Sequence, residues 1–157
     1  MTIKQPWRLV IEILACFISL EALRIVLMFI IDIVPQLFDY LKATEVDRFN
    51  GIASYADAVY LAPLFETLAI AILVGVFFKV TDKLVLICTS VASLAGAAHL
   101  HAGLLTASSA IVSFYVLTFF YIRWLKLAGR AKGFIAALVP HMLTNSLAVA
   151  VIVLDAG

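Results

Sequence analysis

Four polar side chains stand inside long apolar stretches, where they are costly, and their types suit acid–base chemistry. Glu66 lies well inside one stretch, with no basic residue near it in the sequence. His99 lies in a second stretch, and His141 and Asn145 lie in a third, four residues apart and therefore on one face of a helix. A glutamate can act as a general base toward water, a histidine can share or relay the proton, and a His/Asn pair can donate to a developing oxyanion. Such groups can equally hold helices together by hydrogen bonds, and the spacing alone leaves both interpretations open.

The other ionisable residues in the apolar stretches favour a structural role. Glu21 and Arg24 are three residues apart and can pair on one helical face, and Glu12 lies nearer the end of the same stretch, where it can reach water. His101 points away from the face that carries the other histidine of its stretch. We expect it at the membrane interface or in packing, with a His-x-His metal pair as the alternative.

The elements that must position these side chains are set by composition. Of the 157 residues, 65% are hydrophobic and 13% are charged, about half the charged share of a soluble domain. A bilayer core of about 30 Å needs roughly 20 apolar helical residues, and a backbone in lipid must satisfy its own hydrogen bonds. The sequence therefore predicts an all-α, multi-pass transmembrane helical bundle that forms a single domain over residues 1–157. About five transmembrane helices are expected, at 7–34, 56–78, 84–105, 107–127 and 134–154.

The connections between these helices carry turn signals. Gly103 and the pair Ser108 and Ser109 bracket a very short third connection, and residues 129–133 separate the last two helices. The longest loop, 36–54, mixes charges with apolar residues at helical spacing. It predicts either a short helix in the outer interface or a solvated loop.

The depths of the candidate residues constrain the bundle further. At a rise of about 1.5 Å per residue, Glu66, His99 and His141 do not fall at the same depth along straight helices. Tilted helices or a short third helix would have to bring them together.

The distribution of positive charge predicts an orientation. The net charge of +1 leaves no basic excess for a nucleic-acid partner. The N-terminus and the second and fourth connections share one side and carry most of the basic residues, whereas the other side has only Lys42 and Arg48. By the positive-inside rule we expect an integral membrane protein with its N-terminus in the cytoplasm and its C-terminus outside, a pattern that suits a bacterial inner membrane.

The polar residues resemble a family signature. The chain is similar to the CPBP family, the CAAX-protease and bacteriocin-processing intramembrane endopeptidases. That family carries a Pro ahead of Glu-Glu-x-x-x-Arg, then Phe-x-x-x-His, then His-x-x-x-Asn/Asp, each on its own transmembrane helix. Here Pro63 precedes Glu66 by three residues, His99 matches the second motif, and His141 with Asn145 matches the third. The order and spacing agree over about residues 60–150.

The resemblance implies an intramembrane endopeptidase that acts on a membrane-anchored protein or peptide. By that resemblance Glu66 and His99 would activate a water, while His141 and Asn145 would stabilise the oxyanion. Three positions depart from the pattern: Thr67 replaces the second glutamate, Ala71 the arginine and Ala95 the phenylalanine. The departures put substrate positioning in question.

Two other functions and one cofactor stay open from the sequence. The chain could be a non-catalytic CPBP-like membrane protein that binds a partner in immunity or regulation, or a small proton-linked transporter that uses the polar residues as a relay. No metal is favoured, because the helical His-Glu-x-x-His arrangement is missing; if zinc takes part, its ligands would be Glu66, His99 and His141. The substrate and the oligomeric state are not fixed by the sequence.

Overall fold

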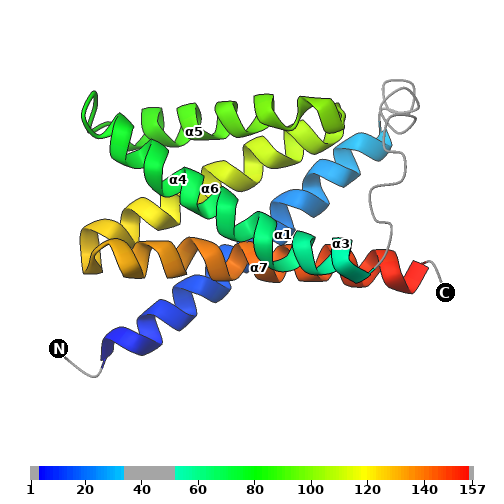
Figure 1. Cartoon of the computed structure of the whole chain (residues 1–157), viewed down its shortest axis with the longest axis horizontal. Helices are drawn as coiled ribbons and strands as arrows, with labels where there is room; N and C mark the ends of the chain where they lie inside the picture. Colours follow the sequence, from blue (N-terminus) through cyan, green and yellow to red (C-terminus); the bar gives the residue numbers. More distant parts are fainter. Residues whose placement is uncertain (1–3, 34–51, 156–157) are drawn as a thin grey trace.

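The described part of the chain, residues 4–33 and 52–155 of a computed structural model, is helical and contains no strand. This confirms the predicted all-α bundle (Figure 1). The helices are α1 (Lys4–Ile33), α3 (Ile52–Ala56), α4 (Ala62–Phe77), α5 (Leu84–Ala98), α6 (Leu104–Ala128) and α7 (Arg130–Asp155). A π-helical turn, η1 (Asp57–Leu61), joins α3 to α4, and a 3₁₀ turn, η2 (Leu100–Ala102), follows α5.

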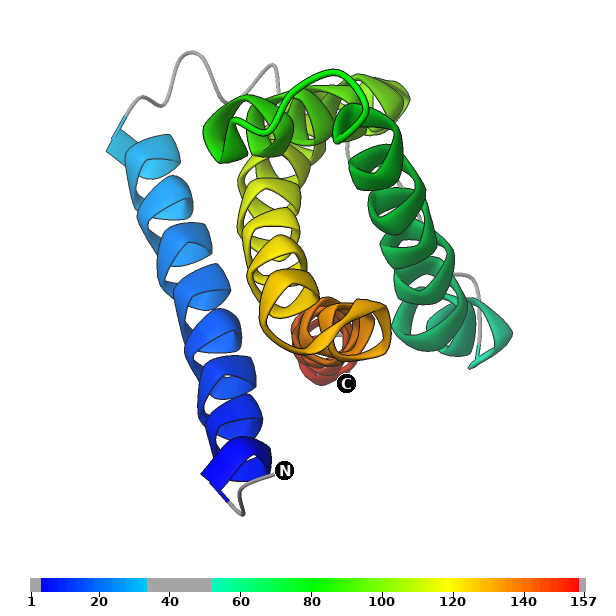
Figure 2. The same cartoon turned by 90° about the vertical axis from the view of Figure 1, so that its left-hand side faces the viewer.

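Helix α6 is the centre of the arrangement. It packs against α5, α7, α1 and α4, and seen from the side it stands between α1 and α4, with α5 across one end and α7 across the other (Figure 2). One cluster of buried apolar side chains takes members from all five long helices: Leu20 of α1, Ile70 of α4, Ile87 of α5, Leu117 of α6 and Ala137 of α7. The long helices thus share one core.

Two glycines set the ends of α6. Gly103 precedes it with φ of 102° and Gly129 follows it with φ of 87°, a backbone region that residues with a Cβ rarely adopt. Helices α6 and α7 start about three and four residues earlier than the predicted 107 and 134. Ser108 and Ser109 lie inside α6, where the Ser108 hydroxyl donates to the Leu104 carbonyl, and α7 starts directly after Gly129.

The third predicted helix, 84–105, is also too long. Helix α5 ends at Ala98 after 15 residues, roughly 22 Å, which is shorter than a bilayer core. His99 caps its C-terminus, and the chain then turns through η2 into α6. A short third helix was one of the two conditions for bringing the candidate residues to a common depth.

The outer surface of the helices is apolar. Phe65, Ile25 and Val85 are each about two-thirds exposed, and a surface of this kind is stable against lipid rather than water. By length and composition, three helices of the described chain can cross a membrane: Ser54–Phe77, Leu104–Ala128 and Arg130–Leu154. The chain is thus a membrane protein; the expected span at 7–34 stays a prediction.

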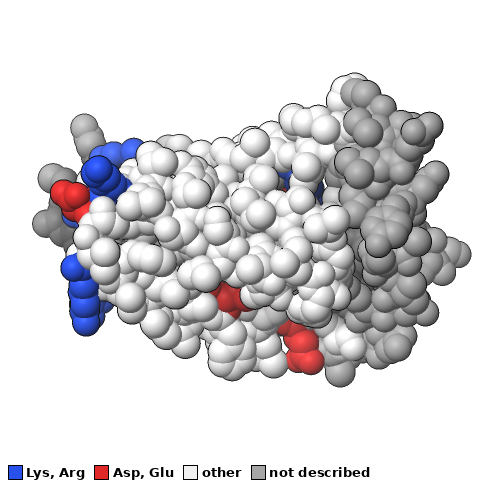
Figure 3. Space-filling view, turned by 90° about the horizontal axis from the view of Figure 1, so that it is seen from above, with Lys and Arg blue, Asp and Glu red and all other residues white. Residues whose placement is uncertain are grey.

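Basic side chains gather at one end of the molecule (Figure 3). This end carries the start of α1, the turn from α4 to α5 and the turn from α6 to α7 (Figure 1). There Glu12 of α1 accepts from Arg8, at 3.1 Å, and from Arg123 of α6, at 2.8 Å. Glu12 therefore joins two helices instead of facing only water.

Two further predictions meet different outcomes. No ion pair joins Glu21 to Arg24 in the described residues, and one carboxylate oxygen of Glu21 is buried without a hydrogen-bond partner. Residues 36–51 of the predicted interface segment, 36–54, lie outside the described residues. Residues 52–54 form the start of α3.

Candidate active site

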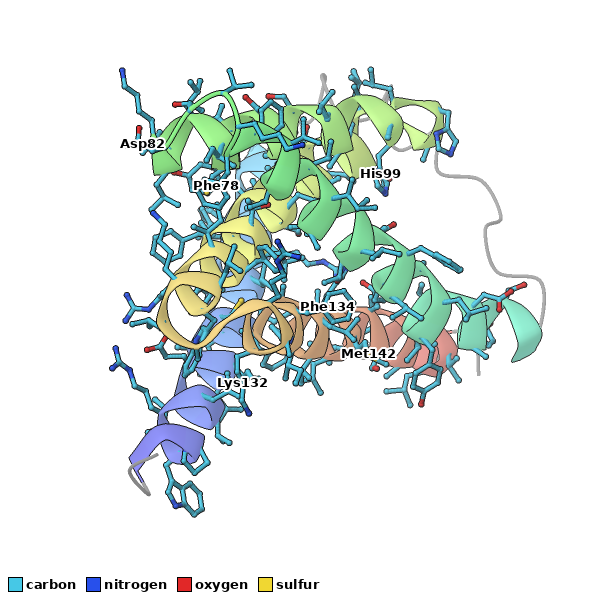
Figure 4. The ribbon with its side chains drawn as sticks, turned by 60° about the vertical axis from the view of Figure 1, so that its left-hand side comes forward. Phe78, Asp82, His99, Lys132, Phe134 and Met142 are labelled. Atoms are coloured by element: carbon cyan, nitrogen blue, oxygen red, sulfur yellow. The ribbon has the colours of Figure 1, made fainter. Side chains whose placement is uncertain are left out.

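The structure brings three of the four predicted side chains into direct contact. Glu66 Oε2 lies 3.1 Å from His141 Nε2, and Glu66 Oε1 lies 3.5 Å from His99 Nε2. The three residues come from α4, α7 and the end of α5, and Figure 4 shows His99 extending from the end of α5 toward α4. One carboxylate is therefore placed between two imidazoles that are 42 positions apart in the sequence.

A backbone carbonyl of α5 determines which ring nitrogen of His99 carries a hydrogen. Its Nδ1 lies 2.8 Å from the Ala95 carbonyl, and because a carbonyl only accepts, Nδ1 must carry the proton. In a neutral ring Nε2 then presents a lone pair toward the Glu66 carboxylate. Two facing acceptors need a hydrogen between them or a donor beside them, and a water molecule, with two hydrogens, can donate to both.

His141 has the opposite arrangement. Its Nε2 is at hydrogen-bond distance from Glu66, while its Nδ1 is buried and has no partner. Because a carboxylate oxygen only accepts, Nε2 carries a hydrogen and donates it to Glu66. His141 is only 7% exposed, whereas Glu66 and His99 are 28% and 27% exposed at the side chain. Glu66 and His99 are thus the accessible pair, and the buried His141 is hydrogen-bonded to the same carboxylate.

Phe114 of α6 contacts both imidazoles. Its ring centroid is 5.9 Å from that of His99 and 5.8 Å from that of His141, and the side chain is buried. Tilted and edge-on contacts at this distance are favourable between aromatic rings. The sequence gives no signal for this role, because Phe114 is one of eleven phenylalanines.

Asn145 lies on the same face as His141 but binds elsewhere. Its Nδ2 donates to the carbonyl of Ala58 in η1 at 2.8 Å. In η1 the amide of Ala62 bonds to the Asp57 carbonyl, and the next amide along the helix, which should serve Ala58, belongs to Pro63 and has no hydrogen. Asn145 therefore satisfies a carbonyl that Pro63 leaves free. The predicted oxyanion role of Asn145 stays a prediction, since one amide hydrogen of the side chain is left for it.

The three residues that depart from the family pattern lie in different environments. Thr67 is fully buried and its hydroxyl has no hydrogen-bond partner. Ala71 lines a cavity on the basic side of the site. Ala95 is buried in α5, and its carbonyl is the group that fixes His99.

Glu66 and the side chains around it include the three that would have to hold zinc. Across the described residues, no group of three or more His, Cys, Asp and Glu side chains is arranged to hold a metal ion. A His141 ring that offered Nε2 to a metal would need a hydrogen on Nδ1, and that buried atom has no acceptor beside it. The residues as placed therefore do not fit zinc.

Comparisons with protein-family models, with curated proteins and with solved structures find no match for this chain.

Proposed function

We propose that this chain is an intramembrane endopeptidase, similar to the CPBP family, that cleaves a membrane-anchored protein or peptide. The observation that carries the proposal is the contact of one partly exposed carboxylate with two imidazoles from two other helices. Ionisable groups at such a position are expensive in a membrane, and they usually mark a functional site.

The accessible pair, Glu66 and His99, holds the water. One hydrogen of the water is donated to Glu66 Oε1 and the other to His99 Nε2, which lie 3.5 Å apart. Glu66 then takes one proton while the oxygen attacks the peptide carbonyl. The proton-bearing Nδ1 of His99 keeps its bond to Ala95, so the ring does not turn during the step.

His141 responds to the movement of charge. Before the step its Nε2 hydrogen is bound to the Glu66 carboxylate. When Glu66 is protonated its oxygen becomes a weaker acceptor, and the negative charge moves to the substrate oxygen. The His141 hydrogen bond then shifts to this oxyanion, assisted by the free amide hydrogen of Asn145. When the oxyanion collapses and the peptide C–N bond breaks, the proton held by Glu66 passes to the nitrogen of the leaving amine.

The proposal also includes the orientation of the protein in the membrane. The basic end of the bundle faces the cytoplasm, so the N-terminus is inside and the C-terminus outside, in a bacterial inner membrane. Helix α5 then ends toward the outside, and the reactive pair lies nearer the outer half of the membrane.

Cleavage of co-expressed membrane-anchored candidate substrates tests the proposal. Glu66→Gln, His99→Ala and His141→Ala should each abolish processing while the protein still accumulates in the membrane. His101→Ala is the matched control, because His101 is exposed and its Nδ1 contacts only the nearby Ala98 carbonyl. Processing that survives the Glu66 and His99 changes would show that the cluster is structural, and the non-catalytic function would replace this one.

A further inference from the structure

A cavity of about 820 Å³ opens between α4, α6 and α7, toward the basic end of the molecule. Helices α4 and α7 are close near α3 and diverge toward that end (Figures 1 and 4). Its walls are Ala71, Ile72, Gly75 and Phe78 of α4 and its C-cap, Tyr121 and Leu125 of α6, and Arg130, Ala131, Phe134 and Ile135 of α7. Sites for small ligands have volumes of ~300–1,000 Å³, so the space suits a ligand.

The cavity is separate from the candidate active site. Ala71 is the wall residue of α4 nearest to Glu66 and lies five positions beyond it, which is roughly 7.5 Å along the helix. Small residues on α4 keep the space open: a Cβ added at Gly75 would meet no atom within 4 Å. The space is thus available to a molecule that takes no part in the chemistry at Glu66.

The charged residue in the cavity lining is basic. The lining has no acidic residue, and Arg130, at the mouth, is exposed and forms no ion pair with any described residue. A second cation, Lys126, lies 5.6 Å from the centre of the Phe78 ring, but it lines a neighbouring surface pocket and not this cavity. The rest of the lining is apolar apart from the buried Tyr121 hydroxyl.

We propose that this cavity binds an anionic phospholipid, with an acyl chain between α4 and α7 and its phosphate beside Arg130. The ligand needs one apolar tail and one negative head, and the head must stay at the membrane surface while the tail lies below it. Basic pockets between transmembrane helices recognise anionic head groups in this way. A bound tail also covers the apolar walls where α4 and α7 separate.

Lipid retention by purified protein tests this site independently of any protease activity. The detergent-solubilised protein is titrated with phosphatidylglycerol or phosphatidylcholine, and bound lipids are counted by native mass spectrometry. We expect phosphatidylglycerol to be retained several-fold better than phosphatidylcholine. Arg130→Gln should remove this preference, and Gly75→Leu, which fills the space, should reduce retention of both lipids.

Lys83→Gln is the matched control, because Lys83 is an exposed cation at the same end of the molecule but does not line the cavity. Its phosphatidylglycerol retention should equal that of the wild type. Equal retention of the two lipids by the wild type, or an Arg130→Gln variant that keeps the preference, would overturn the proposal. Retention of a lipid-anchored peptide but not of phosphatidylglycerol would do so too, and would assign the cavity to the substrate.

Discussion

At the scale of the residue, the structure turns a set of polar side chains into a directed arrangement of hydrogen bonds. Glu66 contacts both His99 and His141, and the two histidines differ in which ring nitrogen carries the hydrogen. The difference comes from one carbonyl: Ala95 faces His99 Nδ1, while no acceptor faces His141 Nδ1. In the proposed mechanism the two histidines therefore have different roles: His99 accepts a hydrogen bond from the water, and His141 donates one to the Glu66 carboxylate.

This difference predicts two tautomers in the resting protein. His99 should carry its hydrogen on Nδ1, and His141 should carry it on Nε2. Nitrogen chemical shifts of histidine-labelled protein in bilayers report the tautomers, with His99→Ala and His141→Ala used for assignment. A neutral His99 with its hydrogen on Nε2 would contradict the arrangement, because the ring could then no longer accept from a water.

At the scale of the element, the turn before α4 depends on a residue of α7. Pro63 removes the amide that would serve the Ala58 carbonyl, and Asn145 replaces it. An unsatisfied carbonyl in a membrane is costly. Asn145 thus links η1 to α7 close to the site, which gives it a positioning function whether or not it also contacts the substrate.

A double-mutant cycle measures this link. Asn145→Ala should cost about 1–3 kcal/mol of stability, because it leaves the partly buried Ala58 carbonyl without the Asn145 donor. In a Pro63→Ala background residue 63 regains an amide hydrogen, so the same change should cost less. Unfolding in mixed detergent gives the free energies. The control is Ser146→Ala, since the Ser146 hydroxyl donates to the Met142 carbonyl of its own helix. If the Pro63 and Asn145 changes have additive effects on the free energy of unfolding, the link is contradicted.

Two glycines on different helices should respond in opposite ways to alanine. A Cβ at Gly133 of α7 would lie 2.8 Å from the Tyr121 carbonyl oxygen and 3.0 Å from the Leu125 nitrogen, both backbone atoms of α6. Gly133→Ala should therefore destabilise the protein by about 1–3 kcal/mol. Gly75→Ala meets open space and should be neutral or stabilising by up to about 1 kcal/mol. Equal melting temperatures for the two variants would show that α6 and α7 are not in close contact at Gly133.

The sequence predicted the elements better than their ends. Long apolar runs with Glu66, His99 and His141 inside them were enough for the helical class and for three members of the cluster. The end of α5 was missed because the apolar run continues through His99 into α6, and only the positive φ of Gly103 breaks it. The partner of Asn145 was missed because it is a backbone carbonyl, freed by a proline 82 positions away, and no side-chain pattern records such a contact.

At the scale of the whole molecule, the start of α1 and the end of α7 lie at opposite ends of the bundle (Figure 1). The basic end holds the start of α1 and the turns that precede α5 and α7. If this end faces the cytoplasm, reporters fused to the N-terminus and to the C-terminus should be found on opposite sides of the membrane, with the N-terminus inside. A cytoplasmic C-terminus would contradict the proposed orientation and place the reactive pair on the other side.

The central claim is that Glu66 activates a water for peptide cleavage, and it is tested most directly by mapping protein termini in membranes. Cells with the wild type, Glu66→Gln or His101→Ala are compared by quantitative mass spectrometry of the new chain ends. Loss of a general base lowers rates by about 10²–10⁴-fold, so termini of at least one membrane-anchored protein should disappear with Glu66→Gln and persist with His101→Ala. Identical termini in wild-type and Glu66→Gln membranes, with both proteins present in equal amounts, would contradict the account.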